Sequence, residues 1–465
     1  MNNAAPKVSV IKMYAAREEI YPRETSGRFA TLRWLCVWLT QLTFYGLPWM
    51  VWNGRQAVLF DLGARKFYIF GIVLWPQDFI FLTLLLIICA YSLFLFTAVA
   101  GRVWCGFACP QTVYTEIFMW IERKIEGPRS ARMRLDRQPW NAEKLVRKSA
   151  KHATWGALGL WTGLTFVGYF TPIHVLLHEV TGLTLGPWEW FWVLFYSFAT
   201  YGNAGWMREQ VCKYMCPYAR FQSSMFDKDT LIVTYDKELG EPRGARSKKE
   251  DSGKGLGDCI DCSMCVQVCP TGIDIRKGLQ YECIGCAACI DACDSVMEKI
   301  SAPLGLIRYS TEHAIQNHWS TAQIRAHLAR PRVLIYTGLL LAIVTAFCIT
   351  LFLRTPLKLD VIRDRGVMAR EVEDGMIENV YRLQVMNTGE TAHRYKVSVS
   401  GIDSIVLATP DVITLDGTAS RGIPVRVRVA HGKGKVGSNK IAFELQAIDD
   451  EHLHVKEKAI FFVPE

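Results

Sequence analysis

The chain has 465 residues, half of them hydrophobic, with 15 tryptophans and a formal net charge of +9. A chain of this length usually divides into several domains. A positive mean hydropathy and abundant tryptophan are typical of proteins that lie partly in lipid, and they argue against a soluble enzyme. Most lysines and arginines flank apolar runs. We therefore expect them to face lipid phosphates, with no nucleic-acid partner.

The apolar segments predict a membrane protein. Residues 1–31 form a polar, basic arm without the apolar core and cleavage site of a signal peptide, so no cleaved leader is expected. A membrane-spanning helix takes about 20 apolar residues. The strictly apolar part of the fourth candidate is short, and a buried helix is the alternative there. The candidate spans are 32–52, 79–100, 154–171, 188–206 and 333–353.

The distribution of basic residues predicts the orientation of these spans. Residues 1–31, 102–151 and 208–332 are rich in Lys and Arg and should be cytoplasmic. The connections 53–76 and 172–187 carry three such residues and none, respectively, and should lie outside. Five crossings from a cytoplasmic start place the chain after residue 353 on the far side. The main alternative adds a re-entrant helix near residues 67–74.

Two matching CxxxCP motifs follow the second and fourth predicted spans. Residues four apart share one face of a helix, so each motif is expected to form a two-thiolate clamp at the cytoplasmic face. The membrane part then reads as a duplicated two-span unit, and its two clamps could make one four-thiolate site for Cu(I), zinc or an iron–sulfur centre. Inert buried thiols are the alternative. The four cysteines are Cys105, Cys109, Cys212 and Cys216.

The strongest signal is a pair of C-x₂-C-x₂-C-x₃-C runs. This is the spacing of bacterial two-cluster ferredoxins, in which three thiolates of a run bind one cubane and the fourth binds the other. The first [4Fe–4S] cluster is therefore assigned to Cys259, Cys262, Cys265 and Cys293. The second is assigned to Cys269, Cys283, Cys286 and Cys289.

A structural zinc site is the alternative for these runs, because CxxC pairs also bind zinc. Pro270 directly after the first run favours the ferredoxin interpretation. Asp294 stands where the second run would have its proline, so the sequence does not predict the conformation of the turn after this run. Paired clusters of this kind pass single electrons.

Other cofactor signals are weak. No pair of histidines lies deep in facing spans to hold haem, and no G-x-G-x-x-G follows a strand to hold a nucleotide, so electrons must come from another protein or from quinol. His174 and His178 are four apart in an outer connection, where an ordinary interfacial pair is favoured over a copper or zinc clamp. Single cysteines inside apolar spans are expected to be core residues: Cys36, Cys89 and Cys348.

The segment 354–465 has a different character. Stretches such as NVYRLQVMNTG, HRYKVSVSGI and GIPVRVRVA alternate apolar and polar residues between turns rich in Gly, Asn and Asp. This pattern predicts an antiparallel β-sandwich of immunoglobulin-like type, for which docking is the expected role. No inter-sheet disulfide is possible, because no cysteine follows Cys348.

Nearly end to end, the chain resembles the FixG/CcoG (RdxA) family of cytochrome c oxidase accessory proteins. The resemblance rests on WCGFACPQTVYTEIFMWIERKIEG, QVCKYMCPYARFQSSMFD, the double ferredoxin run, CIDACDSVMEKI with PLGLIRYS, a last span and a β-rich tail. It implies a bacterial inner-membrane protein that reduces Cu(II) to Cu(I) for the oxidase copper centre, with oxidase assembly factors, copper transporters or chaperones as partners.

In the light of this resemblance, copper is the substrate or a transient ligand of the four CxxxCP thiols, which become the copper-handling or relay site. The electron donor stays unidentified. A quinol-linked respiratory carrier, like related membrane polyferredoxins, and a non-catalytic copper chaperone or assembly scaffold are the alternatives.

The expected fold is a multi-domain membrane protein. It combines an α-helical transmembrane bundle of about five spans with an inserted two-cluster ferredoxin-like domain and a C-terminal immunoglobulin-like β-sandwich. The expected divisions are a cytoplasmic arm (1–31), a membrane domain (32–240), a cytoplasmic two-[4Fe–4S] domain (241–310), a cytoplasmic linker (311–332), a last span (333–353) and a periplasmic sandwich (354–465).

Overall fold

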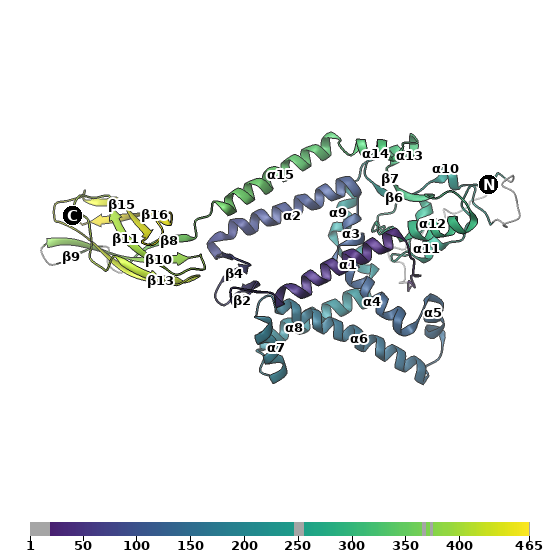
Figure 1. The fold of residues 1–465 in the computed structure, drawn as a ribbon, viewed down its shortest axis with the longest axis horizontal. Helices are drawn as coiled ribbons and strands as arrows, with labels where there is room; N and C mark the ends of the chain where they lie inside the picture. The colour runs from purple at the N-terminus through teal and green to yellow at the C-terminus, as the bar shows by residue number, and fades with distance from the viewer. Residues whose placement is uncertain (1–18, 246–254, 365–368, 373–374, 465) are drawn as a thin grey trace, which may run out of the picture. The chain divides into compact units, whose positions relative to one another are not determined.

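The computed structural model of the chain describes residues 19–245, 255–364, 369–372 and 375–464 (Figure 1). The expected absence of a cleaved leader concerns mostly residues 1–18, which lie outside this part. The chain forms two compact units. Unit 1 contains Met1–Thr43, Tyr91–Leu164 and Pro187–Gly338, and unit 2 contains Phe44–Ala90, Thr165–Gly186 and Leu339–Glu465.

Helices make up most of each predicted span, but residues 51–52 form a strand and residues 168–171 form turns. The helices are α1 (Arg28–Gly46), α2 (Phe79–Ala100), α6 (Ala142–Val167), α8 (Pro187–Thr200) with the π-helix η3 (Tyr201–Met207), and α15 (Pro331–Phe352). Among the described residues, two helical segments are long and apolar enough to cross a bilayer, Pro76–Ala100 and Pro331–Phe352. The number of five spans therefore stays a prediction.

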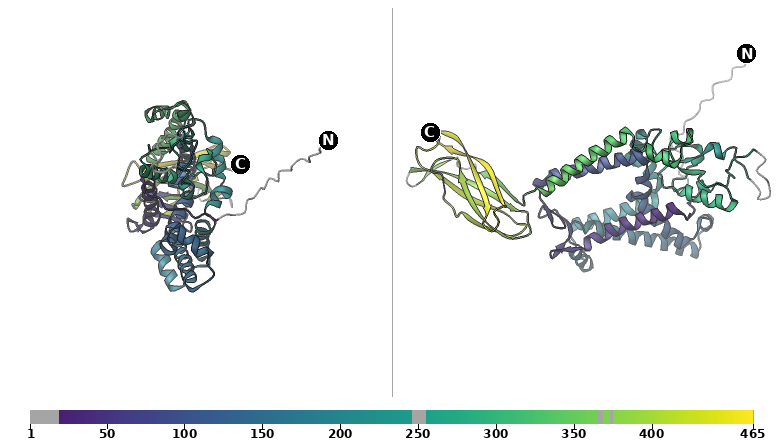
Figure 2. Two further views of the ribbon diagram at one scale, coloured as in Figure 1. Left: turned by 90° about the vertical axis from the view of Figure 1, so that its right-hand side faces the viewer. Right: turned by 45° about the horizontal axis from the view of Figure 1, so that its top comes forward.

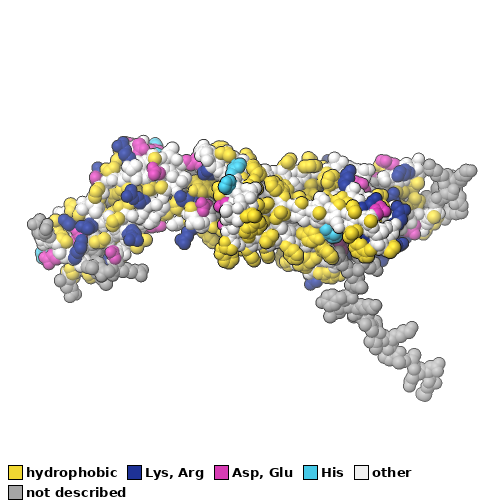
Figure 3. Space-filling view, turned by 90° about the horizontal axis from the view of Figure 1, so that it is seen from below, with side chains coloured by type: hydrophobic (Ala, Val, Ile, Leu, Met, Phe, Trp, Pro, Cys, Tyr) yellow, Lys and Arg dark blue, Asp and Glu magenta, His cyan; other side chains and the backbone are white. Residues whose placement is uncertain are grey.

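The apolar surfaces of these helices suit lipid. Phe79 of α2 and Phe352 of α15 expose 67% and 87% of their surface, and similar side chains follow along both helices. Figure 3 shows broad hydrophobic areas on one face of the molecule. Exposed apolar area of this extent indicates a membrane environment.

Strands occupy the segment where a re-entrant helix was the alternative. A three-stranded antiparallel sheet consists of β3 (Val58–Asp61), β4 (Lys66–Ile69) and β5 (Ile72–Leu74). The re-entrant helix is therefore wrong, because the chain turns back at Phe70, whose φ of 52° is left-handed, and β4 pairs with β5 across that turn. A hairpin of β1 (Val51–Trp52) and β2 (Arg55–Gln56) precedes this sheet and turns at Asn53-Gly54.

The C-terminal region is a β-sandwich, as the alternating pattern predicted (Figure 2). One sheet has the order β12-β14-β10-β8, with β9 also paired to β10, and the other has the order β13-β11-β15-β16. Tyr381 and Phe443 meet between the sheets with ring centroids 5.1 Å apart. The strands are β8 (Leu357–Arg363), β9 (Arg370–Val372), β10 (Met376–Asn387), β11 (His393–Ser400), β12 (Val406–Leu407), β13 (Val412–Leu415), β14 (Ser420–Val429), β15 (Gly437–Ala447) and β16 (His454–Val463).

Within unit 2, buried contacts join the sandwich to the segment before α2. The carboxylate of Asp78, almost fully buried, lies 3.0 Å from Arg354 and also pairs with Lys358 at the start of β8. Val73 and Trp75 pack against Met386 of β10. Short helices complete this unit: η1 (Leu47–Trp49), η2 (Pro76–Asp78) and α7 (Ile173–Gly182).

The ferredoxin-like region in unit 1 begins earlier than residue 241. Strand β6 (Ile232–Tyr235) pairs antiparallel with β7 (Ile307–Ser310), so the chain from residue 232 already belongs to this fold. The boundary is displaced because β6 closes the sheet only with a strand about 75 residues further along the chain. Helices between them are α10 (Lys237–Gly240), α11 (Met264–Gln267), η5 (Ile275–Lys277) and α12 (Ala288–Ile300).

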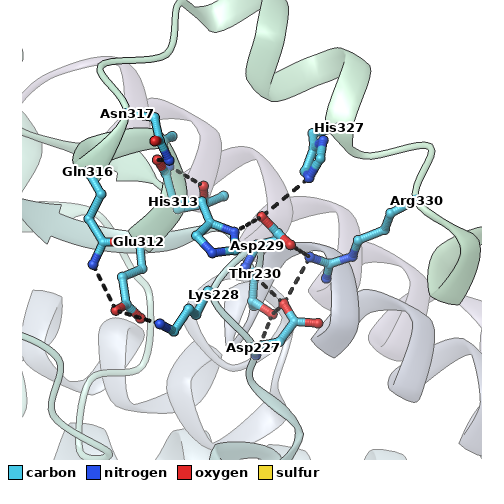
Figure 4. A network of polar contacts seen from close by, with 12 residues as sticks. Asp227, Lys228, Asp229, Thr230, Glu312, His313, Gln316, Asn317, His327 and Arg330 are labelled. Atoms are coloured by element: carbon cyan, nitrogen blue, oxygen red, sulfur yellow. Dashed lines mark hydrogen bonds and ion pairs between the residues drawn. The ribbon is translucent and has the colours of Figure 1, made fainter.

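The segment expected to be a cytoplasmic linker is folded. It contains α13 (Glu312–Gln316) and α14 (Thr321–His327). An ion pair and a hydrogen bond hold it to the turn before β6, as Figure 4 shows: Arg330 lies 2.9 Å from Asp227, and the His313 ring nitrogen lies 2.8 Å from the Asp229 carboxylate. Residues 311–332 are therefore tied to the dicluster fold at both ends.

Candidate metal centre

The two cysteine runs adopt the same backbone conformation. The residue before the second cysteine has a left-handed φ in both runs, 53° at Asp261 and 66° at Gly285. The residue after it does too, 56° at Ser263 and 59° at Ala287. A helix then begins at the next residue in each case. Left-handed residues turn the chain sharply, so each run curls its thiols toward one point.

The thiols sort into the two predicted sets. Burial raises the pKa of Cys293 to about 12, and the thiols of Cys265, Cys259 and Cys262 add to this effect because they lie close to it. Burial likewise raises the pKa of Cys289, with Cys286, Cys283 and Cys269 as the nearest contributing thiols. The fourth cysteine of each run thus lies with the other run, as two-cluster ferredoxins require.

These residues fit two [4Fe–4S] clusters. Four cysteines of the second set, Cys269, Cys283, Cys286 and Cys289, line one cavity in the core of the domain. Burial raises the pKa of Cys283 to about 12 and that of Cys265 to about 11. Such thiols ionise only when a positively charged metal core replaces their protons. Two sets of four such thiols are a donor set that suits iron–sulfur clusters.

Asp294 explains a difference between the two runs. Pro270 follows the first run, and α11 has only four residues. With Asp294 in the equivalent place, α12 continues without a break to Ile300. The Asp294 carboxylate accepts a hydrogen bond of 3.1 Å from the backbone N–H of Gly305. The missing proline therefore lengthens a helix and leaves the positions of the cysteines unchanged.

The CxxxCP motifs do not form clamps on single helices. Cys105 lies on the short helix α3 (Val103–Phe107), but Cys109 has ψ 128° and precedes α4 (Pro110–Glu126). Cys216 is likewise extended, at ψ 110°, before α9 (Pro217–Met225), and Cys212 lies on the π-helix η4 (Val211–Met215). The helical clamp is wrong because a residue that precedes proline is driven out of the α-helical region.

The structure nevertheless places Cys105 and Cys212 in one apolar cluster, with Cys109 and Cys216 nearby. Burial raises the pKa of Cys212 to about 12, and the thiols of Cys109, Cys105 and Cys216 contribute by charge repulsion. Burial raises the pKa of Cys105 as well, opposed by the guanidinium of Arg102. We call Cys105, Cys109, Cys212 and Cys216 the four-thiol centre.

A buried polar group borders the four-thiol centre. The Cys105 thiol donates to Oε1 of Gln222 at 3.4 Å, and Nε of Arg102 donates to the same oxygen at 3.1 Å. Arg102 also donates to the backbone carbonyl of Tyr281. Among the described residues, no carboxylate forms an ion pair with this buried guanidinium. Its charge is therefore available to nearby thiolates.

The four-thiol centre packs directly against the second cluster set. Cys105 and Cys212 share one apolar cluster with Cys286 and Cys289. A Cβ added at Gly106 would lie 2.8 Å from the Cα of Cys286, so only glycine allows α3 to approach this loop so closely. The two thiol groups are therefore neighbours within one unit.

Asp291 joins the dicluster domain to the first helix. Its carboxylate accepts hydrogen bonds from the backbone N–H groups of Phe29, at 3.1 Å, and Ala30, at 2.7 Å, at the start of α1. An acidic side chain there satisfies orphan donors and complements the helix dipole. Sequence reasoning missed Asp291, because the contact joins residues more than 250 positions apart.

A buried charge network supports the second motif. Glu122 of α4, 3% exposed, lies 3.1 Å from Arg132 of α5 (Arg129–Arg137) and 3.0 Å from Arg208. Burial alone would raise the pKa of Glu122, but Arg208, Arg132 and Lys151 together hold it below its usual value. Arg208 stands four residues before Cys212, so the network helps to position η4.

The single cysteines and the histidine pair that the sequence singled out belong to neither the cluster sets nor the four-thiol centre. Cys36, Cys89 and Cys348 lie on α1, α2 and α15. His174 packs edge-on against Trp49 at 5.5 Å between ring centroids. In the described part of the chain, no three or more His, Cys, Asp or Glu side chains are grouped closely enough to hold a single metal ion. This is true of the eight ferredoxin cysteines too.

Comparisons with known proteins agree with this architecture. A model of a 4Fe-4S dicluster domain matches residues 207–312, and a 4Fe-4S binding domain model matches residues 82–128. A third model, the IG-like fold at the C-terminal of FixG, matches residues 347–464, and its description names FixG as a candidate oxidoreductase.

Whole-length relatives are similar as well. The nitrogen fixation protein FixG of Rhizobium meliloti is 38% identical, with 94% of this chain and 91% of the relative covered. Proteins RdxB and RdxA of Cereibacter sphaeroides are each 40% identical, covering 92% and 89% of this chain and 92% and 87% of their own. The crystal structure of a FixG-related protein from Vibrio parahaemolyticus is 21% identical and covers 24% of this chain and 99% of its own, with a TM-score of 0.22.

Proposed function

Because the chain belongs to the FixG, RdxA and RdxB family of iron–sulfur proteins, we propose that it reduces Cu(II) to Cu(I) for the copper centre of a haem-copper cytochrome c oxidase. The observation that carries the proposal is the packing of the four-thiol centre against Cys286 and Cys289. Soft thiols beside an iron–sulfur domain combine an electron source with groups that prefer Cu(I).

The chemistry requires one electron for each copper ion. The two [4Fe–4S] clusters, when bound, store and pass single electrons. Cu(II) held near the four-thiol centre takes one electron from the reduced protein and becomes Cu(I). A cytosolic one-electron donor then restores the reduced protein. Thiolates stabilise Cu(I) over Cu(II), which raises the copper potential and makes the transfer favourable.

The residues around the centre support this transfer in separate ways. Arg102 places a positive charge beside Cys105, which favours the thiolate form that soft metals bind. Gly106 keeps α3 close to the loop of Cys286. Apolar neighbours such as Val268 and Ile284 exclude water from the contact. Close approach and a dry contact both favour electron transfer over side reactions with water.

Location and partners follow from the same proposal. The basic segments support a dicluster domain in the cytoplasm and a C-terminal sandwich in the periplasm, on either side of a bacterial inner membrane. The sandwich then docks oxidase assembly factors, copper transporters or chaperones.

The direct test uses purified, chemically reduced protein in detergent under argon. Cu(II) is added, Cu(I) is measured with a chromogenic chelator, and the iron–sulfur EPR signal is followed in parallel. The quadruple variant Cys105→Ser, Cys109→Ser, Cys212→Ser, Cys216→Ser is compared with Cys348→Ser, a matched change on α15.

The expected result is loss of the reduced EPR signal in step with the appearance of Cu(I), abolished in the quadruple variant and unchanged in the control. Reduced protein that ignores Cu(II) but is reoxidised by quinone would identify a respiratory electron carrier. Copper binding without reduction would identify a chaperone or scaffold.

A further inference from the structure

The two CxxxCP motifs present four thiols in matching settings. Cys109 and Cys216 both have extended backbone, and a proline at the first helical position follows each. Cys105 and Cys212 each lie four residues earlier and both pack in the apolar cluster beside Cys286. Each half of the membrane region therefore contributes one thiol next to a helix start and one toward the dicluster domain.

The four thiols and the ferredoxin cysteines share one property. The four thiols lie close enough to raise each other's pKa. Yet the described residues contain no group of three or more ligands compact enough for one metal ion. The ferredoxin cysteines have this same property, and they belong to a 4Fe-4S dicluster domain.

The charge of the surroundings points to an anionic occupant. Arg102 is 5% exposed and faces the thiols of Cys105, Cys212 and Cys283. Its hydrogen bonds go to the neutral oxygens of Gln222 and Tyr281. A buried cation without a carboxylate partner is costly unless another negative group compensates it. Four thiolates around an iron–sulfur core carry a net negative charge.

Family similarity gives an independent reason. The 4Fe-4S binding domain model covers residues 82–128, which include Cys105 and Cys109 and none of the ferredoxin cysteines. The dicluster model begins at residue 207, before Cys212 and Cys216. Both motifs thus lie within stretches that match iron–sulfur proteins.

We propose that Cys105, Cys109, Cys212 and Cys216 bind a third [4Fe–4S] cluster, shared between the two halves of the membrane region. The inference rests on the proposed function only in taking the four-thiol centre as the place where electrons leave the protein. It identifies the four-thiol centre as an electron relay in which iron binds all four thiolates. Because these thiolates then bind iron, they do not hold copper as the proposed function has it, and Cu(II) takes its electron beside the centre.

Iron content tests this inference without any activity measurement. Full-length protein is purified anaerobically, reconstituted with iron and sulfide, and analysed for iron, acid-labile sulfide and Mössbauer signal. We expect about twelve iron atoms per chain, against about eight for two cubanes. The double variants Cys105→Ser/Cys109→Ser and Cys212→Ser/Cys216→Ser should each lose about a third of the iron and keep the EPR signals of the ferredoxin pair. Cys348→Ser should lose none.

Either of two results would overturn the third cluster. One is about eight iron atoms in fully reconstituted wild-type protein, which decides the matter even if the double variants fold poorly. The other is unchanged iron in both double variants. If copper binds these thiols in place of iron, the protein contains about eight iron atoms, and the proposed copper reduction still stands. Conversely, about twelve iron atoms in a protein that does not reduce Cu(II) support the third cluster and refute the proposed function.

Discussion

Replacing Gly106 by alanine is the sharpest perturbation of the contact between α3 and the second cluster set. The added Cβ would lie 2.8 Å from the Cα and N atoms of Cys286 and 2.8 Å from the carbonyl oxygen of Ile284. All three are backbone atoms of a loop that the cluster ligands hold in place. Real Cβ atoms do not approach so closely, so α3 or the loop must move.

The cost follows from this geometry. Overpacking a close contact costs about 1–3 kcal/mol, and a clash with three backbone atoms belongs at the upper end of that range. Alanine recovers about 0.5–1 kcal/mol of helix propensity relative to glycine. The net destabilisation should therefore be about 2 kcal/mol. Because the displaced surfaces join the four-thiol centre to the dicluster domain, reoxidation of the reduced protein by Cu(II) should also slow severalfold.

Gly156→Ala is the matched control. Gly156 lies within α6, and an added Cβ there meets no atom within 4 Å. This variant should gain about 0.5–1 kcal/mol and keep the wild-type rate. Thermal unfolding in detergent gives the stability, and stopped-flow absorbance of the iron–sulfur chromophore gives the rate. Equal stability and equal rates for the two glycine variants would refute the close packing of α3 on the Cys286 loop.

Four further changes test charged side chains of the protein. Glu122→Gln leaves its buried cationic partners uncompensated, so unfolding in denaturant should show a loss of about 3 kcal/mol. Burial would raise the pKa of Asp136, but Lys148 and a tyrosine hydroxyl outweigh burial and hold that pKa below its usual value. The ionised carboxylate therefore stabilises the folded protein at pH values above the unfolded-state pKa. This stabilisation is lost as the pH falls through the lower folded-state pKa. Asp136→Asn should accordingly flatten the loss of stability below about pH 4 in denaturant titrations. Arg102→Gln removes about 1–2 kcal/mol of favourable interaction between the guanidinium and the nearby thiolates. EPR redox titrations should therefore show the reduction potential of an iron–sulfur cluster lowered by roughly 40–90 mV. Asp78→Asn breaks two ion pairs at the start of the C-terminal domain, and limited proteolysis should release that domain faster.

Local spacing predicted the iron–sulfur part of the protein well. The exchange of the fourth cysteines between the two runs, Cys269 and Cys293, stays a prediction from ferredoxin spacing, and the thiols that neighbour Cys289 and Cys293 agree with it. Alternation of apolar and polar residues likewise predicted the C-terminal sandwich. These signals are encoded in short stretches of sequence, which is why they could be interpreted without tertiary information.

The errors have identifiable local causes. The CxxxC spacing suggested a helix face, but Pro110 and Pro217 force the preceding cysteines into extended backbone. The apolar stretch near Phe70 suggested a re-entrant helix as an alternative, but the chain turns there between paired strands. The dipeptide Asn53-Gly54 is a hairpin signal in the sequence, and the structure forms a hairpin there.

The contacts that position the centre could not be predicted in this way. Arg102 meets Gln222 across 120 residues, and Asp291 meets Ala30 across 261. Neither pair has a periodic or spaced pattern that would identify its partner. A buried arginine in particular reads as an ordinary basic residue at a membrane boundary until its surroundings are known.

One cysteine of the first set is exposed and one of the second set lies beside the four-thiol centre, which suggests a direction for electron flow. Cys262 of the first set is exposed, whereas Cys286 of the second set is buried beneath α3 and shares an apolar cluster with Cys105. Cys262 is the exposed cysteine among these eight, and a soluble donor that docks there reaches the first set. Electrons that enter there would pass Cys286 on the way to the CxxxCP thiols. The duplicated motif makes physical sense in this arrangement, since each half of the membrane region supplies two of the four thiols at that exit.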